Sequence, residues 1–123
     1  MNVPPFALPT DAELTTTASG LKYCAVEDGS GDHPGPRASV TVHYAGWLTD
    51  GTLFDSSYGR GAPISFPLNG VIAGWTEGVQ LMQPGAIYKF VIPPDLAYGA
   101  AGAPPVIGPN ATLLFQVQLL KVG

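Results

Sequence analysis

The stretch GVIAGWTEGVQLMQPG, residues 70–85, predicts a short helix that packs closely against another part of the chain. Four apolar residues follow the spacing of one helical face: Ile72, Trp75, Val79 and Met82. Gly74 and Gly78 lie inside the same segment, although each interior glycine costs about 1 kcal/mol relative to alanine. We therefore expect another element to approach the helix backbone at these two positions. Trp75 either fills the core or also forms the floor of a cavity.

Alternating apolar and polar residues on both sides of this helix predict β-strands. In residues 37–48, Val40, Val42 and Tyr44 share one face, and His43 lies on the other. Further strand-like runs occupy residues 20–27, 53–57, 63–68, 86–93 and 111–122. The sequence thus predicts an α+β fold in which an antiparallel sheet packs one face against a short helix.

Length and composition indicate one folded domain with an N-terminal arm. The chain has 123 residues, which is enough to bury a core without disulfides or metals. Its 16 glycines and 13 prolines punctuate regular apolar runs, and 46% of its residues are hydrophobic, so disorder is not expected. Residues 1–18 show neither strand nor helix periodicity, and we interpret them as an extended arm before a domain at 19–123. Residues 94–110 form a long loop with apolar contents, and loops of that length are usually functional.

Charge and residue content argue against several classes of partner. The net charge is −4 with only five Lys and Arg residues, so no basic surface is available for a nucleic-acid backbone. No apolar run approaches the roughly 20 residues of a membrane span, and the N-terminus lacks the basic start of a signal peptide. The single cysteine, Cys24, is compatible with a reducing compartment. We expect a soluble cytoplasmic protein, with an exported form whose signal has been removed as the alternative.

The sequence contains no motif for covalent or metal chemistry. It has no Gly-x-Ser-x-Gly, no phosphate-binding glycine loop and no His-Glu-x-x-His. The two histidines are His33, in a polar loop, and His43, on a predicted strand. A Ser-His-Asp site would have to combine His43 with Ser56 or Ser57 and Asp55, and nothing in the sequence favours that combination. We predict neither a metal nor a cofactor.

Aromatic and apolar residues gather where the predicted loops meet the sheet, and Asp55 interrupts them. This carboxylate directly follows Phe54 on a half-buried strand, where an unpaired charge is costly. Tyr44 and Arg60 are the nearest residues in the sequence that could donate a hydrogen bond to it. The alternative is a solvent-facing aspartate at the end of the strand.

Four segments, in order along the chain, resemble the FKBP-type peptidyl-prolyl isomerases, the tacrolimus- and rapamycin-binding family. They are VTVHYAGWLTDGTLFDSS (40–57), GVIAGWTEGVQLMQPG (70–85), IPPDLAYGAAG (92–102) and ATLLFQVQLLKV (111–122). The resemblance covers residues 20–122 and implies a curved antiparallel sheet, a half-barrel, wrapped around one short helix. It also implies an active cleft between the sheet and the helix, with Trp75 as its floor.

The resemblance, which covers residues 20–122, also assigns the residues of the cleft. It implies catalytic roles for Asp55, Tyr98, Phe54 and Trp75. It implies contacts with substrate or ligand for Tyr44, Arg60, Ile64, Phe66, Val71, Ile72, Val106, Ile107 and Phe115. In the family, the backbone N–H at Ile72 and the hydroxyl at Tyr98 bind carbonyl groups. The sequence departs from the family pattern at Ile64, where phenylalanine is common, and at Ala103, where some members have histidine.

The function implied by the resemblance is an enzyme that accelerates rotation about X-Pro bonds in an apolar cleft and so assists protein folding. Its expected partners are proline-containing polypeptides and the macrolides tacrolimus and rapamycin, with no nucleic acid, no membrane and a monomeric state. The alternative is a non-catalytic module that binds such ligands in the same cleft. A purely structural domain would leave Asp55 and Tyr98 without a purpose.

Overall fold

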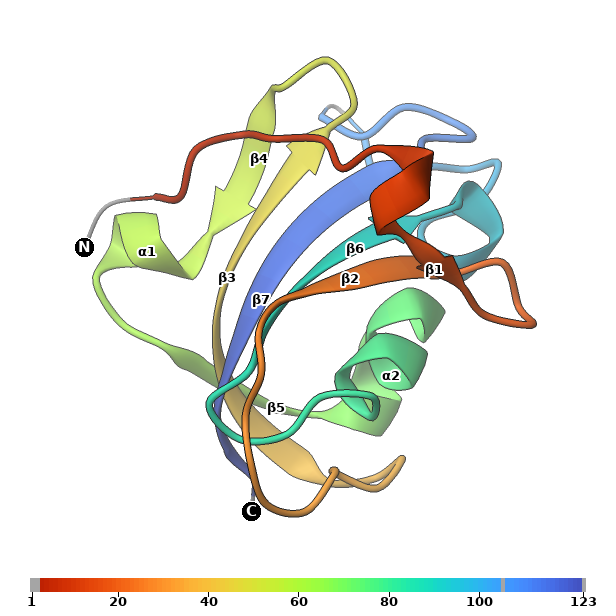
Figure 1. Ribbon diagram of the computed structural model, residues 1–123. Coiled ribbons are helices and arrows are strands. Elements are labelled where there is room, and N and C mark those ends of the chain that lie inside the picture. Colours follow the sequence, from red (N-terminus) through yellow and green to blue (C-terminus); the bar gives the residue numbers. More distant parts are fainter. Residues whose placement is uncertain (1–2, 105, 123) are drawn as a thin grey trace.

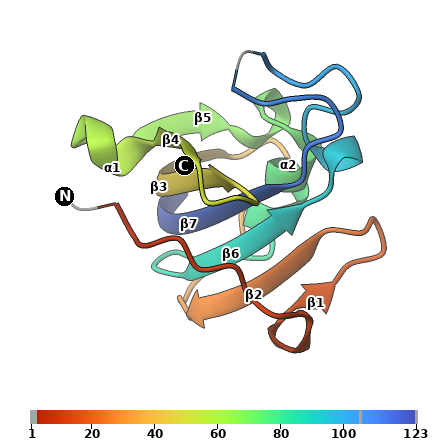
Figure 2. The ribbon, with the colours of Figure 1, turned by 90° about the horizontal axis from the view of Figure 1, so that it is seen from above.

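The computed structural model describes residues 3–104 and 106–122, and its main feature is a curved antiparallel sheet (Figure 1). Its seven strands are β1 (Thr15–Thr16), β2 (Lys22–Glu27), β3 (Ser39–Leu48), β4 (Leu53–Ser56), β5 (Ile64–Pro67), β6 (Ile87–Ile92) and β7 (Leu113–Val122). The strand order is β1-β2-β6-β7-β3-β4, and β5 also pairs with β3. Figure 2 shows the strands from β3 to β1 lying side by side in this order. The sequence-based prediction of an α+β fold is confirmed.

Strand β3 organises the curvature of the sheet because it has two successive partners along one edge. Its first half pairs with β5, from Ser39 to Val42, and its second half pairs with β4, from Ala45 to Trp47. Register shifts interrupt the pairing of β3 with β7 after Thr41 and with β4 after Gly46, and such bulges bend a strand. The result is a half-barrel whose concave side can hold a helix.

Helix α2 (Ala73–Val79) lies on the concave side of the sheet (Figure 1), and its two glycines permit the contact. A Cβ atom placed on Gly74 would lie 2.6 Å from Cγ2 of Ile92, and one on Gly78 would lie 2.7 Å from Cε1 of Phe90. Both distances are far below a normal carbon–carbon contact. The element that approaches the helix backbone is therefore strand β6, which explains why the sequence accepts the cost of two helical glycines.

The helix is shorter than the predicted span of residues 70–85. Residues Leu68–Gly70 form a 3-10 turn, η2, and the α-helix ends at Val79. After that point the N–H groups of Leu81 and Met82 bond three residues back, which tightens the chain into turns before Pro84. Met82 still reaches the core, so the predicted apolar face continues beyond the helix itself.

A second short helix, α1 (Ser57–Arg60), was not predicted. It interrupts the chain between β4 and β5, where the sequence pattern had extended a strand to residue 57. Ser56 caps its N-terminus by accepting the N–H of Gly59 at 3.3 Å, and Gly61 ends it with a positive φ of 73°. One turn of helix is too short to produce an apolar periodicity, so the pattern gave no signal for it.

The N-terminal arm is not a free extension, because it packs against the convex side of the sheet. It contains a 3-10 turn, η1 (Asp11–Glu13), and strand β1, which pairs with β2. The ring of Phe6 meets Trp47 edge to face at 6.1 Å, and the carbonyl of Ala7 accepts a hydrogen bond from Nζ of Lys89 at 3.2 Å. The arm therefore covers outward-facing residues of β3, and the boundary at residue 18 stays a prediction.

The remaining regular element is a 3-10 turn, η3 (Pro94–Leu96), at the start of the long loop that precedes β7. Within the described residues, no helix is long and apolar enough to cross a membrane.

Candidate active site

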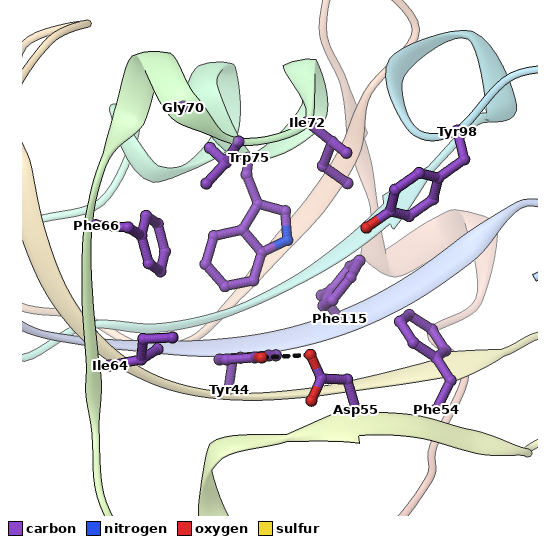
Figure 3. Close-up of a pocket in the computed structure, with 11 residues that line it drawn as sticks. Tyr44, Phe54, Asp55, Ile64, Phe66, Gly70, Ile72, Trp75, Tyr98 and Phe115 are labelled. Carbon is purple, nitrogen blue, oxygen red and sulfur yellow. Dashed lines mark hydrogen bonds between the residues drawn. The ribbon is translucent and has the colours of Figure 1, made fainter. Parts of the chain in front are cut away.

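A cleft with a volume of about 600 Å³ opens between α2 and the concave face of the sheet (Figure 3). Its walls come from β3, β4, β5, η2, α2, β7 and the loop after β6. The residues that line it are Tyr44, Phe54, Asp55, Ile64, Phe66, Gly70, Val71, Ile72, Trp75, Tyr98 and Phe115. Apart from Asp55, the two tyrosine hydroxyls and the indole N–H of Trp75, these side chains carry no polar groups, so the cleft offers few replacements for the water around a polar group.

Trp75 forms the floor of the cleft, with only 5% of its surface exposed. Its ring meets Phe115 and Tyr44 edge to face, at centroid distances of 5.3 and 5.2 Å, and lies 5.3 Å from Phe66. Such geometries are favourable for aromatic pairs and fix each ring relative to its neighbours. Trp75 therefore belongs to the core cluster and also lines the cavity, which is the second of the two interpretations drawn from the sequence.

Gly46 brings two of the aromatic walls together, although the sequence-based assignment did not include it. A Cβ atom at this position would lie 2.6 Å from Phe115 and 2.8 Å from Phe54. The centroids of these two rings lie 5.5 Å apart, edge to face, in the space that a side chain at Gly46 would occupy. A glycine inside a strand pattern was the available signal, because it often marks a close approach.

Asp55 is the acidic residue of the cleft, and the structure pairs it with the two partners considered from the sequence. The Tyr44 hydroxyl donates to Oδ2 at 2.5 Å, and NH1 of Arg60 donates to Oδ1 at 2.8 Å. NH2 of Arg60 also donates to the Tyr44 hydroxyl at 3.0 Å. The three side chains thus form a closed group of hydrogen bonds at the edge of the cleft, in which Asp55 is paired although 42% of its side chain stays exposed.

These contacts determine how the three groups ionise. Burial acts to raise the pKa of Asp55, but the hydrogen bonds from Tyr44 and Arg60 outweigh it, so the pKa lies below its ordinary value of about 3.8. Burial, followed by the hydrogen bond to Asp55, raises the pKa of Tyr44 above about 10. Hydrogen bonds to Tyr44 and Asp55 raise the pKa of Arg60. At neutral pH the group consists of a carboxylate, a neutral phenol and a guanidinium.

Three other donors belong to residues that line the cleft, and one of them is the indole N–H of Trp75 (Figure 3). The Tyr98 side chain, in a residue that is 40% exposed, forms no hydrogen bond with the described residues, and its hydroxyl points inward toward Trp75 (Figure 3). The backbone N–H of Ile72, at the N-terminus of α2, likewise has no acceptor among the described residues. The Tyr44 proton, by contrast, is committed to Asp55. Among the described residues that line the cleft, the donors without an acceptor are therefore at Tyr98, Ile72 and Trp75.

Three of the residues assigned from the sequence do not line the cleft. Arg60 reaches Asp55 and Tyr44 from the outside. Ile107 is buried in the core, where its backbone bridges to Ala103, and Val106 is 49% exposed on the same loop. These positions depend on how the long loop folds back, which the sequence pattern does not specify. Gly70 lines the cleft although it was not assigned, since a residue without a side chain offers no chemical signal.

The histidines lie outside the cleft, and a Ser-His-Asp site is not formed. His43 Nδ1 lies 2.9 Å from Oγ of Ser57, but both residues are buried on the convex side of β3. Asp55 is engaged with Tyr44 and Arg60 rather than with the imidazole. A serine hydroxyl that no substrate can reach is not a nucleophile, so this alternative is wrong.

Comparison with known proteins identifies the class to which this fold and cleft belong. The sequence profile of the family described as FKBP-type peptidyl-prolyl cis-trans isomerase matches residues 31–120. The chain belongs to this family. A protein named peptidyl-prolyl cis-trans isomerase Mip, from Coxiella burnetii (strain RSA 493 / Nine Mile phase I), is 52% identical over 109 residues, which is 89% of this chain and 47% of the relative. A probable FKBP-type isomerase, FkpA of Neisseria meningitidis serogroup B (strain ATCC BAA-335 / MC58), is 55% identical over 110 residues, or 89% of this chain and 40% of the relative.

Solved structures agree with this assignment. The crystal structure of FkpA from Escherichia coli superposes with a TM-score of 0.87 at 51% identity, covering 91% of this chain and 52% of that one. The crystal structure of AtFKBP13 superposes with a TM-score of 0.85 at 34% identity, covering 90% of this chain and 99% of that one. The chain thus spans about half the length of Mip and FkpA, and nearly all of AtFKBP13.

Proposed function

We propose that this chain is a peptidyl-prolyl cis-trans isomerase that binds an X-Pro segment in the cleft between α2 and the sheet. The observation that supports it most strongly is the cleft itself, a largely apolar cavity over Trp75 whose lining includes the Tyr98 hydroxyl and the Ile72 N–H, both without a partner among the described residues. It is built from the segments by which the chain resembles its family. The same cleft contains no histidine and no accessible serine placed for covalent chemistry.

Catalysis of this reaction requires only a small stabilisation of the transition state. Rotation about an X-Pro bond crosses a barrier of roughly 18–20 kcal/mol and takes tens to hundreds of seconds unaided. In the twisted transition state the amide loses conjugation, and its carbonyl oxygen carries less charge than in the planar ground state. An apolar cleft that contacts the twisted form more favourably lowers the barrier. A thousandfold acceleration requires only about 4 kcal/mol of such differential stabilisation.

Each part of the cleft has a distinct role in this proposal. Trp75, Phe54 and Phe115 enclose the proline ring, and the core residue Ile107 supports the loop beside them. The Ile72 N–H and the Tyr98 hydroxyl hold substrate carbonyls. Both residues line the cleft, and neither donor has an acceptor among the described residues, which supports this role.

The Tyr44–Asp55–Arg60 group supplies a fixed, charged edge to the same cleft. Because its hydrogen bonds are already made within the protein, it needs no rearrangement when a substrate binds. In this proposal the group polarises the cleft at this edge. Val71, next to Ile72, completes the apolar wall.

The residue before proline is proposed to be bulky and apolar. Ile64 and Phe66 form an apolar wall on the β5 side of the cleft, and exposed Val106 adds apolar surface on the facing loop. A charged side chain would lose water there without finding a partner. Leu-Pro peptides should therefore react faster than Glu-Pro peptides, and equal kcat/KM values for the two would exclude this preference.

The proposal extends to ligands and clients, where its support is the family membership, and to the cytoplasm, with which the free cysteine Cys24 is compatible. Tacrolimus and rapamycin would occupy the same cleft, the chain would assist the folding of proline-containing polypeptides, and it would act as a monomer in the cytoplasm. Native mass spectrometry tests the oligomeric state directly.

A protease-coupled assay on a short Leu-Pro peptide tests the activity. The proposal predicts acceleration at submicromolar protein and competitive inhibition by tacrolimus. The alternative of a non-catalytic binding module predicts tacrolimus binding by calorimetry, with a peptide rate equal to that in buffer. Absence of both binding and acceleration would contradict both functions.

A further inference from the structure

Behind the cleft, on the convex side of β3, the hydroxyl of Ser57 makes three close contacts. Ser57 is completely buried, and its neighbour His43 is 4% exposed. Oγ of Ser57 lies 2.7 Å from the backbone N of Tyr44, 3.3 Å from the carbonyl O of Tyr44 and 2.9 Å from Nδ1 of His43. Two of these contacts therefore bind the backbone of a residue whose side chain lines the cleft.

The chemistry of a hydroxyl fixes the direction of each hydrogen bond. A serine hydroxyl donates once and accepts twice. The Tyr44 N–H can only donate to Ser57, and the Tyr44 carbonyl can only accept from it. Because the single serine proton goes to the carbonyl, the third bond must be donated by Nδ1 of His43. All three contacts are satisfied together only when His43 carries a proton on Nδ1.

The position of Ser57 explains why its side chain bonds to the Tyr44 backbone, where the backbone of a neighbouring strand would normally do so. The pairing of β4 with β3 places Ser56 opposite Ala45, so Ser57 would be the next partner, opposite Tyr44. The chain instead turns into α1 at this residue. The Ser57 hydroxyl takes over both bonds to Tyr44, so β3 stays anchored at the point where the strand pairing ends.

Ser57 is also connected, through helix α1, to the Tyr44–Asp55–Arg60 group of the cleft. Helix α1 begins at Ser57 and ends at Arg60, whose guanidinium reaches back to Asp55 and the Tyr44 hydroxyl. The imidazole of His43 is itself held by stacking on Tyr58 of α1, at 4.8 Å and 15° between planes. One buried contact thus fixes the backbone of Tyr44 and the start of the helix that delivers Arg60.

We propose that Ser57, held by the Nδ1–H form of His43, is a positioning residue for the Tyr44–Asp55–Arg60 group, a role that rests on the proposed isomerase function. Neither Ser57 nor His43 touches the substrate. They act through the orientation of Tyr44 on one side of β3 and of Arg60 at the end of α1.

A double-mutant cycle tests this proposal through a readout that general destabilisation does not mimic. Ser57→Ala is expected to lower kcat/KM about tenfold in the wild-type chain, and less than twofold in a Tyr44→Phe background, where the hydroxyl to be positioned is already absent. All variants are assayed at a temperature where circular dichroism shows them folded. The same factor in both backgrounds, or no loss in the wild-type background, would overturn the proposal.

A matched control is available on β5, which pairs with the same strand β3. Ser65→Ala removes a serine hydroxyl that pairs with Thr41 of β3 at 2.7 Å, is exposed and does not line the cleft. It is expected to leave kcat/KM unchanged. If Ser57→Ala fails to fold, His43→Asn and His43→Leu replace it: asparagine keeps an N–H at the δ position and should retain activity, whereas leucine should lose it. Equal activities of these two variants would overturn the proposal.

Nuclear magnetic resonance of the His43 imidazole nitrogens at pH 8 tests the hydrogen-bond assignment without any substrate. The expected spectrum has a proton on Nδ1 and an unprotonated Nε2. The opposite tautomer would mean that Ser57 donates to His43 rather than to Tyr44, which would overturn the proposal. Because this readout does not depend on turnover, an inactive wild-type chain would contradict the isomerase function and still leave this assignment decidable.

Discussion

At the scale of single residues, the polar groups of the cleft are of two kinds. Some already form hydrogen bonds with one another, and others have no partner among the described residues. Tyr44, Asp55 and Arg60 satisfy one another, so their contribution is a fixed electrostatic edge. Tyr98 keeps its proton for a bound molecule. The two tyrosines therefore have different roles, although both are aromatic residues that line the same cavity.

Tyr98→Phe tests the role of the free hydroxyl. A hydrogen bond of this kind contributes about 1 kcal/mol net, so kcat/KM should fall about fivefold. The midpoint of thermal unfolding should not change, because the hydroxyl bonds to none of the residues that the structure describes. Unchanged kinetics in this variant would remove Tyr98 from the site.

Asp55→Asn tests the ionisation of the paired group. The pKa of Asp55 is below about 3.8 in the folded chain, so its carboxylate stabilises the fold at higher pH, and this stabilisation is lost as the pH falls through the folded pKa. Denaturant unfolding between pH 6 and pH 2 should show a steeper acid loss in the wild type than in Asp55→Asn. Parallel curves would mean that the carboxylate gains nothing from Tyr44 and Arg60.

The pH dependence of catalysis follows from the same residues. Asp55 stays ionised and Tyr44 stays neutral between roughly pH 6 and 8, and no histidine lines the cleft. kcat/KM should therefore be nearly constant across this range. A bell-shaped profile centred near neutrality would instead require a general acid or base in the reaction.

At the scale of elements, the packing of α2 against β6 is the contact that the sequence predicted best. Two glycines and an apolar face in residues 70–85 were enough to expect it, because close backbone approach leaves few alternatives to glycine. The alternation in β3 and β7 likewise predicted the strands. Helix α1 could not be predicted, since a single turn is fixed by the Ser56 cap and the Ser57 anchor rather than by periodicity. The burial of His43 could not be predicted either, because the arm and α1 cover the convex face only in the folded chain.

Gly78→Ala and Gly59→Ala form a matched pair for the helix contact. Alanine is the better helix former by about 1 kcal/mol at both positions. At Gly78 its Cβ would lie 2.7 Å from the Phe90 ring, whereas at Gly59, in α1, nothing lies within 4 Å. Gly78→Ala should destabilise the fold by about 1–3 kcal/mol, and Gly59→Ala should be neutral or slightly stabilising in denaturant unfolding. Similar effects of the two changes would contradict the packing of α2 on β6.

At the scale of the whole molecule, the sheet has a catalytic side and a supporting side. The concave side carries the cleft, while the N-terminal arm and α1 cover outward-facing residues such as Ala45 and Trp47 on the convex side. The course of the arm could not be predicted from the sequence, since its contacts are few and lie far apart along the chain. The cleft residues were predicted because four segments of the chain resemble a family.

Phe6→Ala tests whether contacts on the convex side affect the stability of the fold without affecting the cleft. Loss of the edge contact with Trp47 should cost about 1 kcal/mol and lower the melting temperature by a few degrees. kcat/KM at 25 °C should not change, because the arm does not touch the cleft. A fall in activity without a fall in stability would show that the arm acts on the site.

Exchange spectroscopy on an isotope-labelled Leu-Pro peptide measures the proposed activity most directly, because it follows cis and trans forms at equilibrium without a coupling protease. Catalytic amounts of the chain should raise the exchange rate in proportion to protein concentration, leave the cis to trans ratio unchanged and lose this effect when tacrolimus is added. An exchange rate equal to that of the peptide alone, at micromolar protein, would contradict the proposal that this cleft catalyses rotation about X-Pro bonds.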